Sequence, residues 1–282
     1  RPNIEGAGLN GVFTVRTPDD AISIRDYVSG RQVKQAVVVG GGFIGLEMAE
    51  NLKEQGVSVT VIDAAAQILP DILDPEMAAY VKRHLAQKGI RVLTNTKAVR
   101  IEGEAEVSGI RTDSALLSCG LVVMAVGIRP NTAFLQDSGV ELDKGKIVVD
   151  SMLRTNVADI FAAGDCAVVT NRLTGKRQWS PMGSSANLEG RTLAQILSGS
   201  EKAYPGVLGT GVVKLPELNC GRTGLCEDQA KAAGYRVITA LAVTDDKAHY
   251  YPDASFFITK LIADQDTHRL LGVQVLGAGN VD

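Results

Sequence analysis

The sequence predicts an α/β protein whose largest part is a Rossmann-like, three-layer nucleotide-binding domain. Residues 36–39 form an unbroken apolar run, which is typical of a strand buried on both faces of a sheet. Directly after it, Gly40, Gly42 and Gly45 have the spacing G-x-G-x-x-G. A helix-forming stretch, a second apolar strand and Asp63 follow in the order that dinucleotide-binding units require.

The three glycines and Asp63 each have a physical task in such a unit. Gly40 permits a tight turn, Gly42 lets a pyrophosphate approach the backbone, and Gly45 lets the helix pack closely on the strand. The unpaired N–H groups at the helix N-terminus favour phosphates. Asp63 lies 18 residues after Gly45 and is placed to accept hydrogen bonds from a ribose 2′-hydroxyl. A glycine-rich turn without a ligand is the alternative, and the complete order of elements argues against it.

The other elements of this domain follow from apolar runs and helix boundaries. Asp74, as N-cap, and Pro75 begin a helix that ends near Gly89. Within this helix His84 is expected at the surface rather than as a metal ligand, because no second candidate ligand stands at helical spacing. We also expect a short strand at 12–15, helices at 17–28 and 46–55, and strands at 57–62, 90–93, within 97–117 and at 119–126.

Two regions with different patterns follow. Strands are expected at 146–150 and 160–163, then Gly164 and Asp165, then a helix at 184–197. An acid at the end of a buried strand beside a helix N-terminus is typical of a ligand site. From residue 204 the pattern is α+β and mostly antiparallel, with strands at 207–214 and 236–243, a helix at 227–233 and a hairpin at 256–263 and 270–276.

The composition is that of a globular protein, with 45% apolar and 22% charged residues. The net charge of −3 argues against nucleic acid, and no apolar stretch approaches the roughly 20 residues that span a bilayer, so no membrane partner is expected. The four cysteines form neither a disulfide framework nor a zinc pattern, which predicts a cytoplasmic protein without a metal site. Because the chain begins at Arg1 and stops after a strand-like run, we expect a fragment of a longer protein.

Together these stretches resemble the pyridine nucleotide-disulfide oxidoreductase family, in the branch of NADH oxidases, NADH peroxidases and coenzyme A disulfide reductases. The resemblance covers nearly the whole chain. The matching stretches are 38–50 for the NAD(H) segment, 126–131 for the segment beside the nicotinamide, 155–167 for the flavin-site motif, 181–191 for the helix that points at the flavin ring, and 204–282 for the start of the dimer-interface domain.

The resemblance implies two cofactors, NAD(H) and FAD, and four parts. Residues 1–30 would be the end of the first FAD-domain segment and a linker, and residues 31–130 the NAD(H)-binding domain. Residues 131–203 would be the second half of the FAD-binding domain, and residues 204–282 the truncated start of an α+β dimer-interface domain.

The cofactor-binding residues that the resemblance implies are Gly40, Gly42, Phe43, Ile44, Gly45, Asp63, Gly127, Gly164, Asp165, Gly183 and Ser184. Asp165 would hydrogen-bond the flavin ribityl chain. Gly183 and Ser184 would present a helix N-terminus to the pyrimidine edge of the flavin, where negative charge builds on reduction. Phe43 and Ile44 would sit beside the flavin, and nicotinamide would displace the Phe43 ring. The family often has Tyr there.

The resemblance also implies catalytic residues. Glu47, on the first turn of the helix, would approach the nicotinamide; the alternative is a charge that points to solvent. Tyr250 and Tyr251 lie in a stretch similar to the one from which coenzyme A disulfide reductases reach a Tyr across the dimer. A structural role for two buried tyrosine rings fits the sequence equally well.

These expectations describe a homodimeric, FAD-dependent oxidoreductase that passes hydride from NADH to flavin. The acceptor would be a small-molecule or thiol/disulfide substrate with a reacting cysteine (disulfide, persulfide), a peroxide, or oxygen. The redox-active cysteine and a second G-x-G-x-x-G do not occur in these 282 residues, so this fragment would hold half a FAD site and be inactive alone. The alternative is a non-catalytic module that senses NADH. NADH is expected over NADPH because Asp63 is followed by Ala64, with no Arg or Lys nearby to neutralise a 2′-phosphate.

Overall fold

A computed structural model describes residues 4–279 and 281. Its first part is built on a five-stranded parallel sheet with the order β1-β8-β2-β3-β4. The strands are β1 (Val12–Phe13), β2 (Gln35–Val39), β3 (Ser58–Ile62), β4 (Arg91–Leu93) and β8 (Leu121–Met124). Their carboxyl ends therefore lie along one edge, where ligands of open α/β sheets bind.

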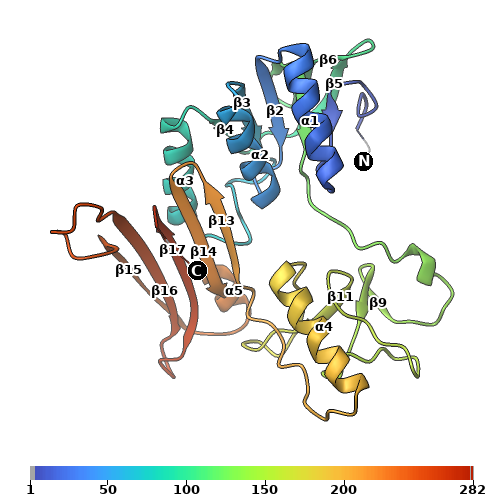
Figure 1. Cartoon of the computed structure of the whole chain (residues 1–282). Coiled ribbons are helices and arrows are strands. Elements are labelled where there is room, and N and C mark those ends of the chain that lie inside the picture. Colours follow the sequence, from blue (N-terminus) through green and yellow to red (C-terminus); the bar gives the residue numbers. More distant parts are fainter. Residues whose placement is uncertain (1–3, 280, 282) are drawn as a thin grey trace.

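The two faces of this sheet are covered differently, which gives three layers (Figure 1). Val38 packs in a core shared with the helices α1 (Pro18–Arg31), α2 (Phe43–Glu54) and α3 (Pro75–Gln87). Val37 and Val39 point the other way, into a core shared with Ile101 and Ile110. Those two residues belong to a three-stranded antiparallel sheet of β5 (Ala98–Gly103), β6 (Val107–Thr112) and β7 (Leu116–Ser118). The predicted Rossmann-like three-layer domain is confirmed, with an antiparallel sheet as its third layer.

The N-terminal stretch, predicted to be the end of an FAD-domain segment and a linker, contributes to this same sheet. Val12 and Phe13 pair with Val122 and Val123 of β8. Ile24 of α1 is buried in the helix-side core. The proposed domain limit near residue 30 remains a prediction, but the sheet itself reaches back to Val12.

The second part is smaller and follows an extended segment after β8 (Figure 1). Its four-stranded sheet has the order β12-β11-β10-β9, and one long helix, α4 (Gly183–Leu197), accompanies it. The strands are β9 (Leu142–Asp143), β10 (Lys146–Val148), β11 (Ala167–Thr170) and β12 (Arg177–Trp179), and a 3-10 turn, Ala133–Leu135, precedes them.

The strand expected at 160–163 is wrong. The N–H of Thr155 bonds to the carbonyl of Ile160, and Arg154 and Phe161 form only an isolated bridge. A left-handed residue, Asp159, closes this tight hairpin and leaves its second arm too short for a strand. The strand that pairs with β10 is instead β11, which begins after Asp165.

The third part is an antiparallel sheet with the order β13-β14-β17-β16-β15 and a short helix, α5 (Glu227–Ala232). The strands are β13 (Gly211–Leu215), β14 (Leu218–Gly224), β15 (Val237–Asp245), β16 (Phe256–Asp264) and β17 (Leu270–Gly277). The predicted α+β character and the β16–β17 hairpin are confirmed. The sequence did not predict β14.

The first and third parts share one hydrophobic core. Val213, Leu215 and Ile258 belong to the same buried cluster as the helix side of the parallel sheet. The rings of Tyr80 on α3 and Phe256 on β16 lie with their centroids 5.5 Å apart. His84 is half-buried rather than free at the surface, with Nε2 2.6 Å from the carbonyl oxygen of Pro216. Figure 1 shows α3 alongside β13 and β14.

Candidate functional site: a dinucleotide turn facing a helix N-terminus

The glycine turn after β2 leaves no room for side chains at two of its glycines. Gly40 has φ +113°, and a Cβ atom there would lie 2.3 Å from the carbonyl oxygen of Ala125. A Cβ atom at Gly45 would lie 1.9 Å from the carbonyl oxygen of Gly40. A Cβ atom at Gly42 would meet no described atom within 4 Å. The turn is thus closed against its own sheet at Gly40 and Gly45 and open at Gly42, where a pyrophosphate is expected.

Asp63, at the end of β3, holds this turn in place. Its Oδ2 accepts a hydrogen bond of 2.6 Å from the N–H of Gly41, and its Oδ1 accepts one of 2.7 Å from the N–H of Ala65. Each carboxylate oxygen keeps a further lone pair for a ligand hydroxyl. Ala64 and Ala66 beside it are exposed and carry no charge. The residue predicted to bind ribose therefore also organises the turn, a task that the sequence did not reveal.

The first turn of α2 carries three of the predicted site residues. Ile44 is 41% exposed, Phe43 is half-buried and Glu47 faces solvent. Neighbouring protein atoms nevertheless desolvate the Glu47 carboxyl in part, and this desolvation raises its pKa above the usual value. Gly127 follows β8 in a segment that begins at Ala125, whose carbonyl touches Gly40. The structure thus brings the residues of the predicted NAD(H) site to one edge of the sheet.

The predicted flavin residues also meet. A Cβ atom at Gly164 would lie 3.7 Å from Cβ of Ala186, so the Gly164–Asp165 turn lies against the first turns of α4. The carbonyl of Asp165 accepts a hydrogen bond of 2.8 Å from Nε1 of Trp179, while its side chain is exposed. Gly183 and Ser184 are exposed at the start of α4.

The start of α4 has the properties that an anionic group requires. No side chain caps this helix at Met182, so its first N–H groups point outward without an intrahelical partner. The exposed Asp165 carboxylate offers acceptors for hydroxyl groups. The residues therefore fit the ring edge and ribityl chain of a flavin, just as the glycine turn and Asp63 fit a dinucleotide.

Residues from the predicted NAD(H) site and from the predicted flavin site both lie against Gly211, the first residue of β13. A Cβ atom there would lie 3.1 Å from Cζ of Phe43 and 3.5 Å from Cε of Met182. Phe43 is the first residue of α2, which follows the glycine turn, and Met182 directly precedes α4. All three parts of the chain thus meet at Gly211, next to the first residue of α2 and the residue before α4.

Tyr250 and Tyr251 lie elsewhere. They stand in the loop between β15 and β16, which Figure 1 shows projecting from the end of the third sheet. The two rings stack with centroids 5.1 Å apart, and the residues are 74% and 52% exposed. The buried-ring alternative is therefore wrong within this chain, and the structure does not bring these tyrosines to the two turns.

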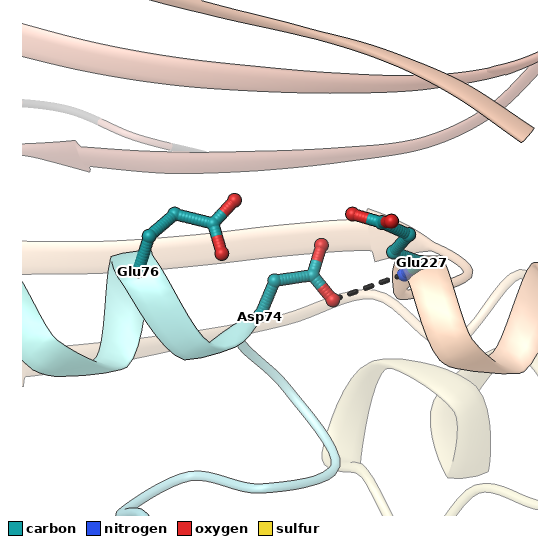
Figure 2. A group of neighbouring side chains, drawn as sticks. All are labelled: Asp74, Glu76 and Glu227. Carbon is teal, nitrogen blue, oxygen red and sulfur yellow. Dashed lines mark hydrogen bonds between the residues drawn. The ribbon is translucent and has the colours of Figure 1, made fainter.

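A cluster of carboxylates lies at the junction of the first and third parts. Asp74, Glu76 and Glu227 have carboxylate oxygens within 4.8 Å of one another (Figure 2). The ammonium of Lys260 lies 2.8 Å from Asp74, 2.5 Å from Glu76 and 3.0 Å from Glu227. A protein cation therefore already occupies the position that a metal ion would take.

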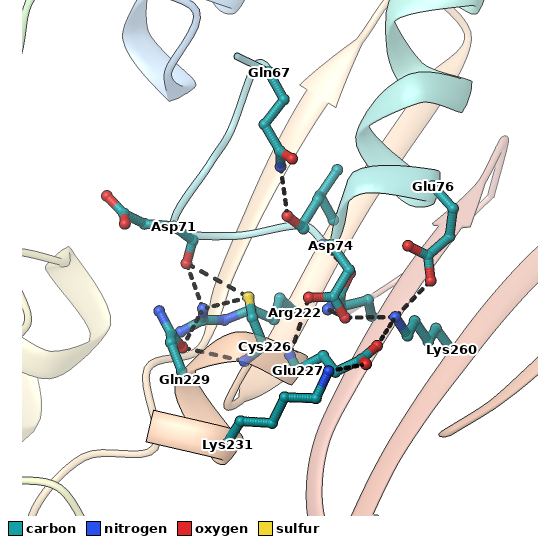
Figure 3. Close-up of polar contacts among 12 residues, drawn as sticks. Gln67, Asp71, Asp74, Glu76, Arg222, Cys226, Glu227, Gln229, Lys231 and Lys260 are labelled. Atoms are coloured by element: carbon teal, nitrogen blue, oxygen red, sulfur yellow. Dashed lines mark hydrogen bonds and ion pairs between the residues drawn. The ribbon is translucent and has the colours of Figure 1, made fainter. Parts of the chain in front are cut away.

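Asp74 takes the N-cap position of α3 as predicted, but its side chain does not cap that helix. Its Oδ1 accepts a hydrogen bond from the N–H of Glu227 (Figure 3). Its Oδ2 accepts one from Nε2 of Gln274. Its own N–H donates to Oε1 of Gln274. The carboxylate thus serves a contact between two parts of the chain, which local helix patterns do not encode.

The four cysteines form no disulfide among the described residues. All are free, and Cys220 and Cys226 are buried. Burial raises the pKa of the Cys220 thiol to about 12 and also raises that of Cys226, which Arg222 contacts at 3.3 Å (Figure 3). Buried thiols of this kind are poor nucleophiles.

Two segments of the chain match known protein families. Residues 1–186 match the profile "Pyridine nucleotide-disulphide oxidoreductase", and residues 211–282 match "Pyridine nucleotide-disulphide oxidoreductase, dimerisation domain". None of the described helices has the length and apolar composition needed to cross a membrane.

Individual proteins and solved structures are similar to this chain over nearly its whole length. A protein named "NAD(P)H coenzyme A polysulfide/persulfide reductase" from Pyrococcus horikoshii is 37% identical over 98% of this chain and 62% of its own length. The structure of an NAD-dependent persulfide reductase from A. fulgidus is 36% identical, with a TM-score of 0.94, over 99% of this chain and 52% of that one. An engineered water-forming NADPH oxidase bound to NADPH is 25% identical, with a TM-score of 0.91, over 100% and 62%. The chain thus spans about half to two thirds of the length of these proteins.

Proposed function

The chain belongs to the pyridine nucleotide-disulphide oxidoreductase family, and we propose that it is part of an FAD-dependent oxidoreductase that passes hydride from NADH to flavin. The electrons would then reach a cysteine-centred acceptor, such as a disulfide or persulfide, a peroxide, or oxygen. The observation that carries this proposal is the meeting of Phe43 and Met182 at Gly211. This contact would bring the nicotinamide of a dinucleotide bound at the glycine turn close to the ring of a flavin bound beside α4.

In this proposal the chain's residues bind and orient. Bound FAD supplies the hydride-accepting chemistry. The open backbone at Gly42 receives the pyrophosphate of NADH, and Asp63 receives the ribose hydroxyl while it fixes the turn. Asp165 binds the ribityl chain, and the N–H groups at Gly183 and Ser184 stabilise negative charge at the ring edge.

Three side chains on α2 would line the space between the two ligands. The Phe43 ring, packed beside Gly211, would cover the flavin until nicotinamide displaces it. Ile44 would line the same space. Glu47, whose carboxyl has a raised pKa, would hydrogen-bond the nicotinamide amide. Gly127 and its neighbours would border the nicotinamide from the end of β8.

The acceptor class is supported by the names of the relatives. The Pyrococcus horikoshii protein is named for coenzyme A polysulfide and persulfide, and the A. fulgidus protein for persulfide. The engineered oxidase is described as water-forming, which names oxygen as the acceptor of that protein. A cysteine-centred acceptor therefore comes first for this protein, with oxygen as the second candidate.

We also propose NADH as the preferred coenzyme. The substitutions named for the NADPH oxidase include a glycine and an aspartate that are 18 residues apart, as Gly45 and Asp63 are here. In that protein the aspartate was replaced by alanine, and the alanine after it by arginine. This chain retains Asp63 and Ala64, the pattern before such a change. A carboxylate without a neighbouring cation repels a 2′-phosphate.

The proposed assembly is a homodimer built through residues 204–282, in the cytoplasm. Most of β15 is exposed, including Ile238, Leu241 and Val243, and apolar strand faces are usually covered by a partner. The stacked Tyr250 and Tyr251 lie in the loop that joins β15 to β16, and they would reach the partner's substrate site. Four free cysteines suit a reducing compartment.

The competing proposal is an NADH sensor without turnover. Full-length, flavin-loaded protein is mixed without oxygen with one equivalent of NADH while the visible flavin absorbance is followed. We expect the flavin band to bleach and then to return on addition of coenzyme A persulfide, a disulfide or oxygen. Tight NADH binding without bleaching would instead favour the sensor.

A further inference from the structure

Glu189 is a buried carboxyl group on α4 with no place in the cofactor contacts described above. It is 2% exposed, although residues on both sides of it, Leu188 and Gly190, are exposed. It lies in the second turn of α4, on the face turned towards the Gly164–Asp165 turn. Glu is rarely fully buried unless it is paired, so its partners define its task.

The Glu189 carboxyl is held by a different segment of the chain. Its Oε2 accepts a hydrogen bond of 2.6 Å from the N–H of Gly164. Tyr204, itself 5% exposed, lies near enough for its hydroxyl and the Glu189 carboxyl to influence each other's pKa. Tyr204 is anchored in turn, because its N–H donates to the carbonyl of Ser151 over 2.8 Å. The carboxyl therefore links α4 to the flavin-side turn, close to the segment that leads to the third sheet.

The bond to Gly164 acts one residue from a predicted flavin contact. Gly164 has φ +83°, so the turn depends on a backbone conformation that few residues adopt. Trp179 holds the carbonyl of Asp165 on the other side. The Asp165 backbone is thus fixed between two hydrogen bonds, while its side chain stays exposed to a ligand.

Building on the proposed function, we propose that Glu189 is a positioning residue of the flavin site. It holds the Gly164 N–H so that the Asp165 carboxylate and the N-terminus of α4 face one and the same ligand. Because Glu189 stands on the helix whose N-terminus meets the flavin, one side chain sets the spacing between the two halves of this contact.

The substitution Glu189→Gln separates geometry from charge. A glutamine carbonyl can still accept the Gly164 N–H, but it carries no charge. Glu189→Ala removes this bond and leaves the Gly164 N–H without a partner. Leu193→Ala is the matched control, because Leu193 lies one turn further on α4 and packs near Tyr204 without any polar link to the turn.

The test measures FAD binding and the flavin spectrum in the full-length protein, stripped of flavin and then titrated. A hydrogen bond to a charged group is worth enough to predict that Glu189→Ala raises the FAD dissociation constant about 10- to 100-fold. We expect Glu189→Gln to stay within about threefold of wild type, and Leu193→Ala to lower the melting temperature with little change in FAD affinity. The visible flavin band should change shape only in Glu189→Ala.

Several outcomes would overturn the inference. Wild-type FAD affinity in Glu189→Ala would show that the bond does not position the turn. Equal losses in Glu189→Gln and Glu189→Ala would assign the effect to charge, and equal losses in Leu193→Ala to general packing. If Glu189→Ala does not fold, Glu189→Gln and Tyr204→Phe decide, since the inference expects both to bind FAD with the wild-type spectrum. A wild-type protein that binds no FAD would refute the proposed function itself, which distinguishes the two failures.

Discussion

The ammonium nitrogen of Lys260 lies 2.8 Å from Oδ2 of Asp74, and neither side chain is more than 4% exposed. Lys260 belongs to β16 of the third sheet, and Asp74 precedes α3 of the nucleotide-binding part. Glu76 and Glu227 complete the contact around the same nitrogen. The position of the dimerisation-type sheet on the nucleotide-binding part thus depends on a buried charge cluster as well as on the shared apolar core.

We predict that Lys260→Met destabilises the protein by about 3–5 kcal/mol, because it leaves Asp74 buried without its cation and three carboxylates facing one another. Chemical denaturation of the wild type and variant measures the loss. Lys247→Met is the control, since the Lys247–Asp253 pair is on the surface and should contribute little to stability. Equal midpoints for Lys260→Met and wild type would contradict this role.

The same cluster predicts a pH dependence. Burial opposes the charge on Lys260, but hydrogen bonds to Asp74, Glu76 and Glu227 outweigh it and raise the pKa of the ammonium. Its stabilising effect is therefore full below the unfolded value of about 10.4 and is lost as pH rises towards the folded pKa. Hydrogen bonds from Lys231 and then Lys260 lower the pKa of Glu227, so its contribution is present above about 4.3 and is lost at lower pH.

The stability difference between wild type and Lys260→Met should accordingly be constant from about pH 5 to 10 and shrink towards acid. Denaturation midpoints collected from about pH 3 to pH 10 provide the measurement. A difference that grows as pH falls below about 4 would be inconsistent with carboxylates as the partners of Lys260.

The geometry of the glycine turn predicts that Gly40→Ala lowers the stability of the protein and that Gly42→Ala lowers its affinity for NADH. Gly40→Ala combines a left-handed backbone with a Cβ atom 2.3 Å from the Ala125 carbonyl, so it should cost at least about 1–3 kcal/mol of stability. Gly42→Ala meets open space and has φ −85°, so it should leave stability within about 1 kcal/mol and weaken NADH at least about tenfold by blocking the pyrophosphate. Melting temperature and NADH titration on both variants separate the two roles. NADH affinity unaffected by Gly42→Ala would mean that the pyrophosphate binds elsewhere.

The parts that the sequence predicted well are those whose signals are local. The buried run of β2, the three glycines and Asp63 stand within 30 residues, and each is explained by its immediate neighbours. The hairpin of β16 and β17 is local too. The failure at 160–163 has the same origin, because an apolar run predicts a strand whether or not it finds a partner of sufficient length.

The contacts that were missed join distant segments. Glu189 looks like an ordinary polar residue of an amphipathic helix, and only the fold brings it to Gly164. Lys260 did leave a signal, since it shares the inward face of β16 with Ile258 and Ile262. A lysine at an alternating apolar position indicates a buried partner, but it does not identify Asp74, because that pairing depends on how two parts of the chain pack.

The last prediction concerns coenzyme choice and rests on the two hydrogen bonds of Asp63. Asp63→Ala should weaken NADH and narrow the gap between NADH and NADPH, because it removes both the ribose acceptor and the acceptor of the Gly41 and Ala65 N–H groups. Asp63→Asn is the control. Its amide oxygen can hold one of these N–H groups while the repelling charge is lost, so it should keep more NADH affinity than Asp63→Ala and admit NADPH.

Adding Ala64→Arg to Asp63→Ala should go further and reverse the preference, because Ala64 is exposed beside Asp63 and a guanidinium there can pair with the 2′-phosphate. Titration of the wild type and of each variant with both coenzymes gives the affinities needed. High salt should weaken the gain in NADPH affinity, as expected for an exposed ion pair. Wild-type protein that binds NADPH as tightly as NADH would contradict the assignment of Asp63. Variants whose NADH and NADPH affinities fall in parallel would restrict Asp63 to holding the glycine turn.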